Sequence, residues 1–210
     1  MKKIALISIL VLGGLSLNAQ NIQLPKPQTD GGENILKTLS IRQSDRSFKE
    51  GDISMEDLST MLWAGFGYVR DGKRTAPSAM NRQDIDLYVF LSKGVYLWNA
   101  KENVLVLVKE GDFRPLTDRE GGFAGKVTNI AIVSNLEKFD IQKDHHNASI
   151  LSAMSAAYVS ENMYLAAYGL NKGLGTVTRY AARQEKQVAE LLNLSKFQRI
   201  YLFQTIGYKK

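Results

Sequence analysis

The chain has 210 residues, of which 44% are hydrophobic and 23% are charged, and its formal net charge is +6. This composition is typical of a globular domain and excludes a disordered or collagen-like chain. The chain contains no cysteine, which excludes structural disulfides, thiolate nucleophiles and cysteine-ligated metals, and no basic run interleaved with aromatic residues indicates nucleic-acid binding.

The first twenty residues have the pattern of a secretory signal peptide. Lys2 and Lys3 precede an uncharged apolar stretch, Ile4 to Leu17, and a small-residue cleavage point follows at Ala19. This stretch is too short to span a bilayer, and no second apolar run approaches that length. The sequence therefore predicts that residues 1–20 are removed on export to the periplasm or cell envelope, which leaves a mature chain without a membrane span.

The mature chain is expected to begin with a short arm followed by two helices. Residues 21–32 hold two prolines and a glycine pair and predict an exposed N-terminal arm. The apolar spacing over residues 33–42 indicates a first helix. Ser54 is the expected N-cap of a second helix, and Asp57 three residues later forms a weak version of the capping box.

The remainder of the chain alternates strand and helix patterns. Four β-rich segments predict strands at residues 86–92, 94–98, 103–109 and 126–134. The longest helix is expected from Ser149 to about Leu170, and because it is apolar nearly all round it must be buried in a core or at a subunit interface. Beyond it we expect a strand at 173–180, a helix at 181–193 and a strand at 200–207. Residues 33–210 therefore predict one α+β domain.

Conventional catalytic sets are lacking. The two histidines, His145 and His146, are adjacent in a polar stretch that predicts a solvated loop, and neighbouring side chains that point apart make a poor pair of metal ligands. The sequence has no nucleophile elbow, zinc-protease motif or P-loop. We therefore expect neither a catalytic side chain nor a metal site, and an enzyme built on this chain needs a cofactor for its chemistry.

Three segments have side chains or backbone suited to cofactor binding. The basic segment, residues 42–48, offers donors for an anionic phosphate; they are Arg42, Ser44 and Arg46. The amide loop, residues 77–83, offers donors and acceptors for the edge of a heteroaromatic ring; its residues of interest are Pro77, Ser78, Asn81 and Gln83. The glycine turn, residues 173–175, lets backbone approach a flat ligand; it consists of Gly173, Leu174 and Gly175. Each segment alone also fits an ordinary surface or loop.

In this order and spacing, the segments resemble the nitroreductase family of FMN-dependent oxidoreductases, including its thiazoline-dehydrogenase-like branch. Residues 42–48 match an Arg-x-Ser-x-Arg-x-Phe motif, and residues 77–83 match a Pro-Ser-x-x-Asn-x-Gln loop. The long helix is similar to the family's dimer helix, and Ile-Gly-Tyr at 206–208 is similar to its final-strand motif. The residues depart from the pattern at two places: Asp84-Ile85 replaces a Pro-Trp pair, and Lys209 replaces a proline.

The resemblance implies an α+β homodimer, in which helices flank a sheet and two FMN molecules lie at the subunit interface. It assigns the flavin phosphate and ribityl chain to Arg42, Ser44 and Arg46, and the isoalloxazine edge to Asn81 within the amide loop. The glycine turn would bring backbone close to the flavin. Lys209 or Lys210 is expected to take the place of the basic residues that often follow the family's final motif.

The function implied by the resemblance is a ping-pong transfer of two electrons through flavin N5. A reduced nicotinamide or another donor would reduce the flavin, and a small nitro, quinone, enone or azoline acceptor would reoxidise it. An exported protein is not expected to meet reduced nicotinamide, so the donor stays open. Two alternatives also stay open: a non-catalytic dimeric scaffold of the same fold that binds flavin or another ligand, and a basic surface-binding module without a cofactor.

Overall fold

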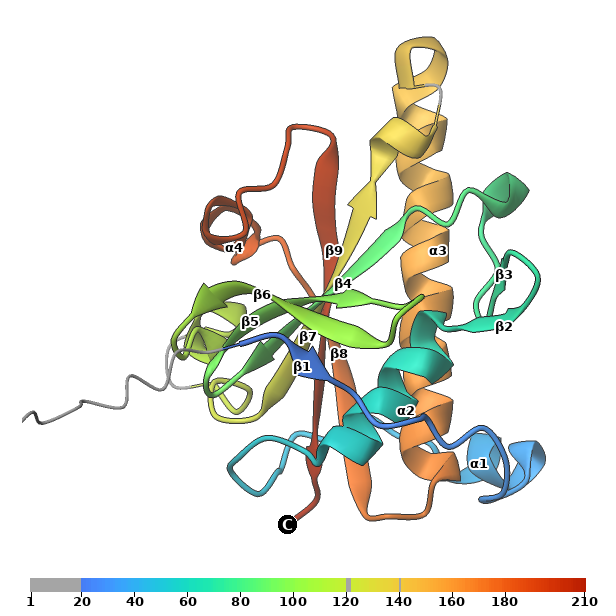
Figure 1. Ribbon diagram of the computed structural model, residues 1–210, viewed down its shortest axis with the longest axis vertical. Coiled ribbons are helices and arrows are strands. Elements are labelled where there is room, and N and C mark those ends of the chain that lie inside the picture. The colour runs from blue at the N-terminus through green and yellow to red at the C-terminus, as the bar shows by residue number, and fades with distance from the viewer. Residues whose placement is uncertain (1–19, 120–121, 140) are drawn as a thin grey trace, which may run out of the picture.

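The computed structural model describes residues 20–119, 122–139 and 141–210. The predicted signal peptide, residues 1–20, therefore lies outside the described residues except for Gln20, and Figure 1 draws that part as a grey trace. In the described part of the chain, no helix is both long enough and apolar enough to cross a membrane.

A seven-stranded antiparallel sheet forms the centre of the molecule, with the strand order β1-β6-β5-β4-β7-β9-β8. Its strands are β1 (Ile22–Gln23), β4 (Ile85–Leu91), β5 (Gly94–Asn99), β6 (Val104–Glu110), β7 (Thr128–Asn135), β8 (Leu174–Tyr180) and β9 (Gln198–Tyr208). A separate two-stranded hairpin consists of β2 (Tyr68–Arg70) and β3 (Lys73–Arg74). The strands expected from the sequence are confirmed to within two residues at each end, whereas β1 and the hairpin were not predicted.

Helices cover both faces of the sheet (Figure 1). They are α1 (Ile35–Ile41), α2 (Met55–Phe66), α3 (Ile141–Gly169) and α4 (Glu185–Leu191), with short 3-10 turns η1 (Ala79–Asn81), η2 (Arg114–Thr117) and η3 (Leu136–Lys138). Alternate side chains of β4 point to opposite faces of the sheet. Val89 packs in a core with α2 and α3, and Phe90 packs in a core with α4. The predicted α+β fold is therefore confirmed.

The N-terminal arm is less exposed than the sequence indicates. The expectation of an exposed arm over residues 21–32 is wrong for its first residues, because Ile22 pairs with Leu105 of β6 and Leu24 is only 4% exposed. Further along, the amide of Gln28 donates to Thr60 Oγ1 at 3.0 Å. The arm satisfies backbone groups that an edge strand would otherwise leave unpaired, so it forms part of the domain.

The long helix α3 begins eight residues earlier than expected, at Ile141 instead of Ser149. His145 and His146 therefore lie in an exposed part of this helix, and their assignment to a loop is wrong. No glycine or proline interrupts the polar residues that precede Ser149, so the helix continues outward beyond its buried part.

The two faces of α3 differ in exposure. Ala156, Val159 and Met163 are fully buried against the core that includes α2. On another side of the helix, Met154 is 50% exposed and Tyr158 is 48% exposed. An exposed apolar stripe on a long helix indicates a surface that another molecule covers.

Candidate functional site

The basic segment follows α1 and lies against the C-terminal half of α3. Ser44 Oγ is 2.9 Å from the hydroxyl oxygen of Tyr164, which also accepts a hydrogen bond from the Thr178 amide at 2.9 Å. The Arg42 guanidinium lies 5.1 Å from the centre of the Tyr164 ring, a cation–π distance. Tyr164, which the sequence analysis did not select, therefore fixes two of the predicted phosphate-binding residues.

The glycine turn and the C-terminal residues meet the basic segment. The amide of Asp45 donates to the carbonyl of Thr176 at 3.0 Å, and the amide of Lys209 donates to the carbonyl of Gly173 at 2.9 Å. A Cβ placed on Gly175 would lie 2.7 Å from Asp45 Oδ2 and 2.8 Å from Lys209 Cγ. A side chain at 175 would therefore displace the side chains of Asp45 and Lys209.

The charges in this cluster leave basic groups free. Within the described ranges, Arg42, Arg46 and Lys209 form no salt bridge. The one carboxylate of the basic segment, Asp45, accepts a hydrogen bond of 2.6 Å from the hydroxyl of Tyr168. Burial, together with the hydrogen bond and charge of Asp45, raises the pKa of Tyr168 to about 12, so this hydroxyl keeps its proton and partly shields the carboxylate.

A cavity of about 360 Å³ opens beside the basic segment. Phe48 and Phe123 form an apolar part of its wall, and Arg46 and Lys210 supply positive charge. The cavity also contains Glu50, but this carboxylate is paired with Lys126 at 2.8 Å. Arg46 and Lys210 form no salt bridge in the described ranges, so they can attract an anion to this cavity.

The amide loop has an unusual backbone. Met80, Asn81 and Gln83 have φ values of 52°, 54° and 50°, a left-handed region that costs energy for residues other than glycine and is typical of functional loops. The side-chain amides of Asn81 and Gln83 both donate to the carbonyl of Gly72, at 3.1 and 2.6 Å. The backbone N–H of Gln83 donates to Ser78 Oγ at 2.9 Å. These bonds hold the loop in one shape.

Arg74 adds a brace behind this loop. Its Nε donates to Gln83 Oε1 at 2.9 Å, and its guanidinium lies 3.7 Å from the centre of the Tyr68 ring. Burial lowers the pKa of Arg74, and the Tyr68 hydroxyl and Asp86 oppose that shift. The β2–β3 hairpin that carries these residues has no clear sequence pattern, so its role in shaping the loop was not predicted.

Asp84, one of the two departures from the family pattern, anchors the end of the amide loop in the core. It is fully buried, and its Oδ2 accepts hydrogen bonds from the hydroxyls of Ser134 of β7 and Ser152 of α3. Its other oxygen, Oδ1, has no hydrogen-bond partner in the described part of the chain. An aspartate here therefore ties the loop to the N-terminal half of α3 by polar contacts.

Within one chain, the amide loop and the basic segment lie at different ends of α3. Pro77 and Ser78 share a cavity of about 270 Å³ with Ser155 and Tyr158, whereas Ser44 contacts Tyr164 and Asp45 contacts Tyr168. Six to thirteen helical residues separate these contacts, about 9 to 20 Å along the helix axis. The structure thus brings the basic segment, glycine turn and Lys209 together and leaves Pro77, Ser78, Asn81 and Gln83 apart from them.

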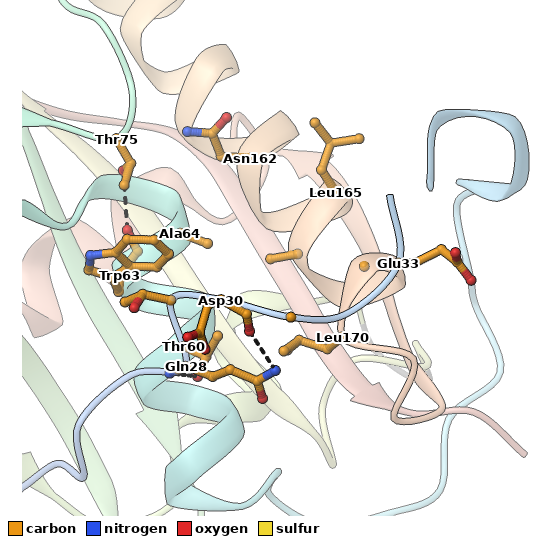
Figure 2. Close-up of a pocket in the computed structure, with 14 residues that line it drawn as sticks. Gln28, Asp30, Glu33, Thr60, Trp63, Ala64, Thr75, Asn162, Leu165 and Leu170 are labelled. Atoms are coloured by element: carbon orange, nitrogen blue, oxygen red, sulfur yellow. Dashed lines mark hydrogen bonds between the residues drawn. The ribbon is translucent and has the colours of Figure 1, made fainter. Parts of the chain in front are cut away.

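A further cavity, of about 330 Å³, lies between the N-terminal arm, α2 and α3 (Figure 2). Trp63, Leu165 and Leu170 give it apolar walls, while Gln28 and Asp30 come from the arm. None of the residues predicted to bind a cofactor lines this cavity, so it is distinct from the basic cluster. No group of three or more His, Asp or Glu side chains that could hold a metal occurs in the described residues.

The comparisons with known proteins agree with the architecture. The nitroreductase family model matches residues 39–208. A solved structure assigned as a nitroreductase from Ralstonia eutropha JMP134 is 32% identical with a TM-score of 0.81, over 91% of this chain and 90% of that chain. A search of curated proteins found no match.

Two more distant structures share the fold. The NADPH:FMN oxidoreductase from Vibrio harveyi, complexed with NAD+, is 16% identical with a TM-score of 0.59, over 85% of this chain and 70% of that chain. An FMN-dependent nitroreductase from Clostridium difficile R20291 is 18% identical with a TM-score of 0.57, over 84% of this chain and 88% of that chain.

Proposed function

The chain belongs to the nitroreductase family of oxidoreductases, and from that premise we propose that it is an FMN-dependent enzyme whose cofactor lies between two subunits. The observation that carries this proposal is the convergence of the basic segment, the glycine turn and Lys209 on one cluster with unpaired cations. A non-catalytic scaffold has no need of such a set unless it also binds a phosphorylated ligand.

The residues of the cluster fit the anionic end of FMN. Arg42, Arg46 and Lys209 offer charge-assisted hydrogen bonds to the phosphate, which are stronger than neutral ones. Ser44, oriented by Tyr164, is placed to hydrogen-bond the phosphate or the ribityl chain. Because Gly175 has no side chain, Asp45 and Lys209 approach its backbone closely, which keeps the basic segment and the C-terminal residues in one cluster.

A second subunit supplies the missing half of the site. Leu36 of α1 is 75% exposed and Met154 of α3 is 50% exposed. A partner subunit that packs on these two apolar surfaces would remove them from water. In a two-fold dimer a contact between α1 of one subunit and the N-terminal half of α3 of its partner occurs twice. Because α1 leads into the basic segment and the amide loop rests on that half of α3, this pairing brings the partner's Asn81 to the basic cluster.

Bound FMN supplies a two-electron transfer in ping-pong order between a reduced donor and a small organic acceptor. The chain's own residues bind and orient: the basic cluster anchors the phosphate, and Asn81 of the partner subunit offers its amide to the ring edge. The nitro, quinone, enone and azoline classes all suit such an acceptor. A reduced nicotinamide is one donor, in keeping with the NADPH-dependent relative.

We also propose that residues 1–20 direct export and that the mature protein works in the periplasm or cell envelope, where a donor other than reduced nicotinamide would be needed. The support is the sequence pattern of a charged start, an apolar stretch and a small-residue cleavage point. Mass determination of the protein recovered from the envelope fraction tests this; an intact Met1 in the cytoplasmic fraction alone would contradict it.

The absorption spectrum of the purified mature protein, before and after addition of FMN, tests the proposed cofactor. Flavin bands that stay with the protein through gel filtration are expected. A colourless dimer that ignores FMN would instead indicate a scaffold of the same fold, and a colourless monomer would indicate a surface-binding module.

A further inference from the structure

The Asp57 carboxylate has other hydrogen-bond partners than its position in the helix predicts. At the third position of α2, a capping-box residue would return its side chain to the Ser54 amide. The Ser54 side chain does accept from the Asp57 amide at 3.1 Å, but the Ser54 amide donates to the hydroxyl of Tyr208 at 3.3 Å. The Asp57 carboxylate, 4% exposed, instead accepts from Lys172 Nζ at 2.8 Å and from the Tyr208 hydroxyl at 2.6 Å.

The two partners of Asp57 flank the cofactor-binding residues. Lys172 directly precedes the glycine turn, and Tyr208 directly precedes Lys209. The connection after α3 needs such support, because Asn171 and Gly173 have φ values of 53° and 72° and residues 171–173 are all exposed. The carboxylate thus joins the start of β8 and the end of β9 to the first turn of α2.

We propose that Asp57 is a positioning residue, which holds the glycine turn and Lys209 in the geometry that binds the cofactor through its bonds to Lys172 and Tyr208. This inference rests on the proposed function, since it concerns the same FMN site. The three residues are called the Asp57 link below. They do not need to touch the cofactor; they fix the segments that do.

The electrostatics support a maintained link. Burial raises the pKa of Asp57, but the hydrogen bonds from Lys172 and Tyr208, together with the charge of Lys172 and a hydrogen bond from Ser54, hold the pKa below its usual value. The carboxylate is therefore ionised at neutral pH.

Stability alone is a poor reason for such a link. Desolvation of the Asp57 carboxylate offsets much of what its pair with Lys172 contributes, and Lys172 itself is 41% exposed, where solvent weakens the attraction. A carboxylate that bonds both Lys172 and Tyr208 fixes the position of these residues relative to each other. It thereby fixes the two backbone segments of the proposed site that they adjoin, the glycine turn and Lys209.

Titration of FMN by quenching of its fluorescence, at a temperature well below unfolding, tests the link. Lys172→Met, at an exposed position, removes the bond to Asp57. Tyr208→Phe, at a half-buried position, removes the bonds to Asp57 and to the Ser54 amide. Asp57→Asn removes the charge at constant size. The control is Glu185→Gln, which removes an acid from the first turn of α4, where it pairs with Arg199 at 3.5 Å. We expect each link variant to weaken FMN binding about tenfold, the size of one charge-assisted hydrogen bond, and the control to bind as the wild type.

Two further readouts separate positioning from general destabilisation. Lys172→Arg keeps a cation within reach of Asp57 and should retain most of the affinity. The double variant Asp57→Asn/Lys172→Met should bind FMN no more weakly than Asp57→Asn alone, because both changes remove the same bond. Independent, additive losses would overturn the inference.

The possible failures are distinguishable. A wild-type protein that does not bind FMN would contradict the proposed function itself. A wild type that binds FMN while Lys172→Met and Tyr208→Phe bind it equally well would overturn only the Asp57 link. Should Asp57→Asn fail to fold, these two variants still decide the question.

Discussion

The exposed apolar face of α1 gives a quantitative prediction for the dimer. In the proposed two-fold dimer, replacement of Leu36 by glutamate removes an apolar contact from each of two symmetry-related patches and places a charge in each. Complete burial of a leucine side chain contributes about 1.5–3 kcal/mol, and Leu36 is 75% exposed in the single chain. Counted twice in a two-fold dimer, the lost burial amounts to about 2–4 kcal/mol, or at least a 30-fold weaker dimer.

Sedimentation equilibrium of the wild type and of Leu36→Glu measures this change directly. Val108→Glu is a matched control, since Val108 is an apolar residue of β6 that is 36% exposed and belongs to neither α1 nor α3. We expect the Leu36 variant to dissociate and to lose FMN in parallel, and the control to stay dimeric. A Leu36 variant that dimerises as tightly as the wild type would refute the assignment of this face to the interface.

Three other predictions concern the cofactor, pH and the core. Arg42→Ala should weaken FMN binding by about 1.5–3 kcal/mol, the range for hydrogen bonds to charged groups; unchanged affinity in a fluorescence titration would remove Arg42 from the phosphate site. The side-chain hydrogen bond from Arg114 lowers the pKa of Asp112 from 3.8, so its stabilising effect is present above that pH and is lost as the pH falls further. In urea denaturation, Asp112→Asn should therefore be less stable than the wild type at pH 7, with the difference shrinking as the pH falls below 3.8; a constant difference would contradict this sign. Met163→Ala, at a fully buried position between α3 and α2, should lower the free energy of unfolding by about 2–5 kcal/mol; a loss below about 1 kcal/mol would mean that the core closes around the gap.

Local patterns predicted most of the strands, because their causes lie within a few residues. The near-continuous apolar runs of β4 and β7 follow from a sheet packed on both faces, because alternate side chains enter the two cores. The cap at Ser54 was also predicted correctly, since its side chain accepts from the Asp57 amide within the same turn. Such signals depend on backbone geometry that the sequence specifies nearby.

Features that depend on distant partners were missed. The sequence places Asp57 in a helix cap, yet its carboxylate contacts Lys172 and Tyr208, more than a hundred residues away. Likewise, nothing near Tyr164 indicates that its hydroxyl meets Ser44. The apolar spacing of α1 predicted a helix correctly, but not that Leu36 faces away from its own chain, because periodicity does not distinguish a core from an interface.

The central proposal is that the basic segment of one subunit and the amide loop of its partner bind the same FMN. Two damaged homodimers test it: Arg42→Ala impairs only the basic segment, and Asn81→Ala impairs only the amide loop. After the two proteins are mixed and subunits exchange, each heterodimer should contain one site with both changes and one intact site. A flavin titration of the equal mixture should then show tight binding restored at about one quarter of all sites, as random pairing in a two-fold dimer requires. A mixture that binds FMN no better than its two parents would contradict the claim and place both segments of each site on the same chain.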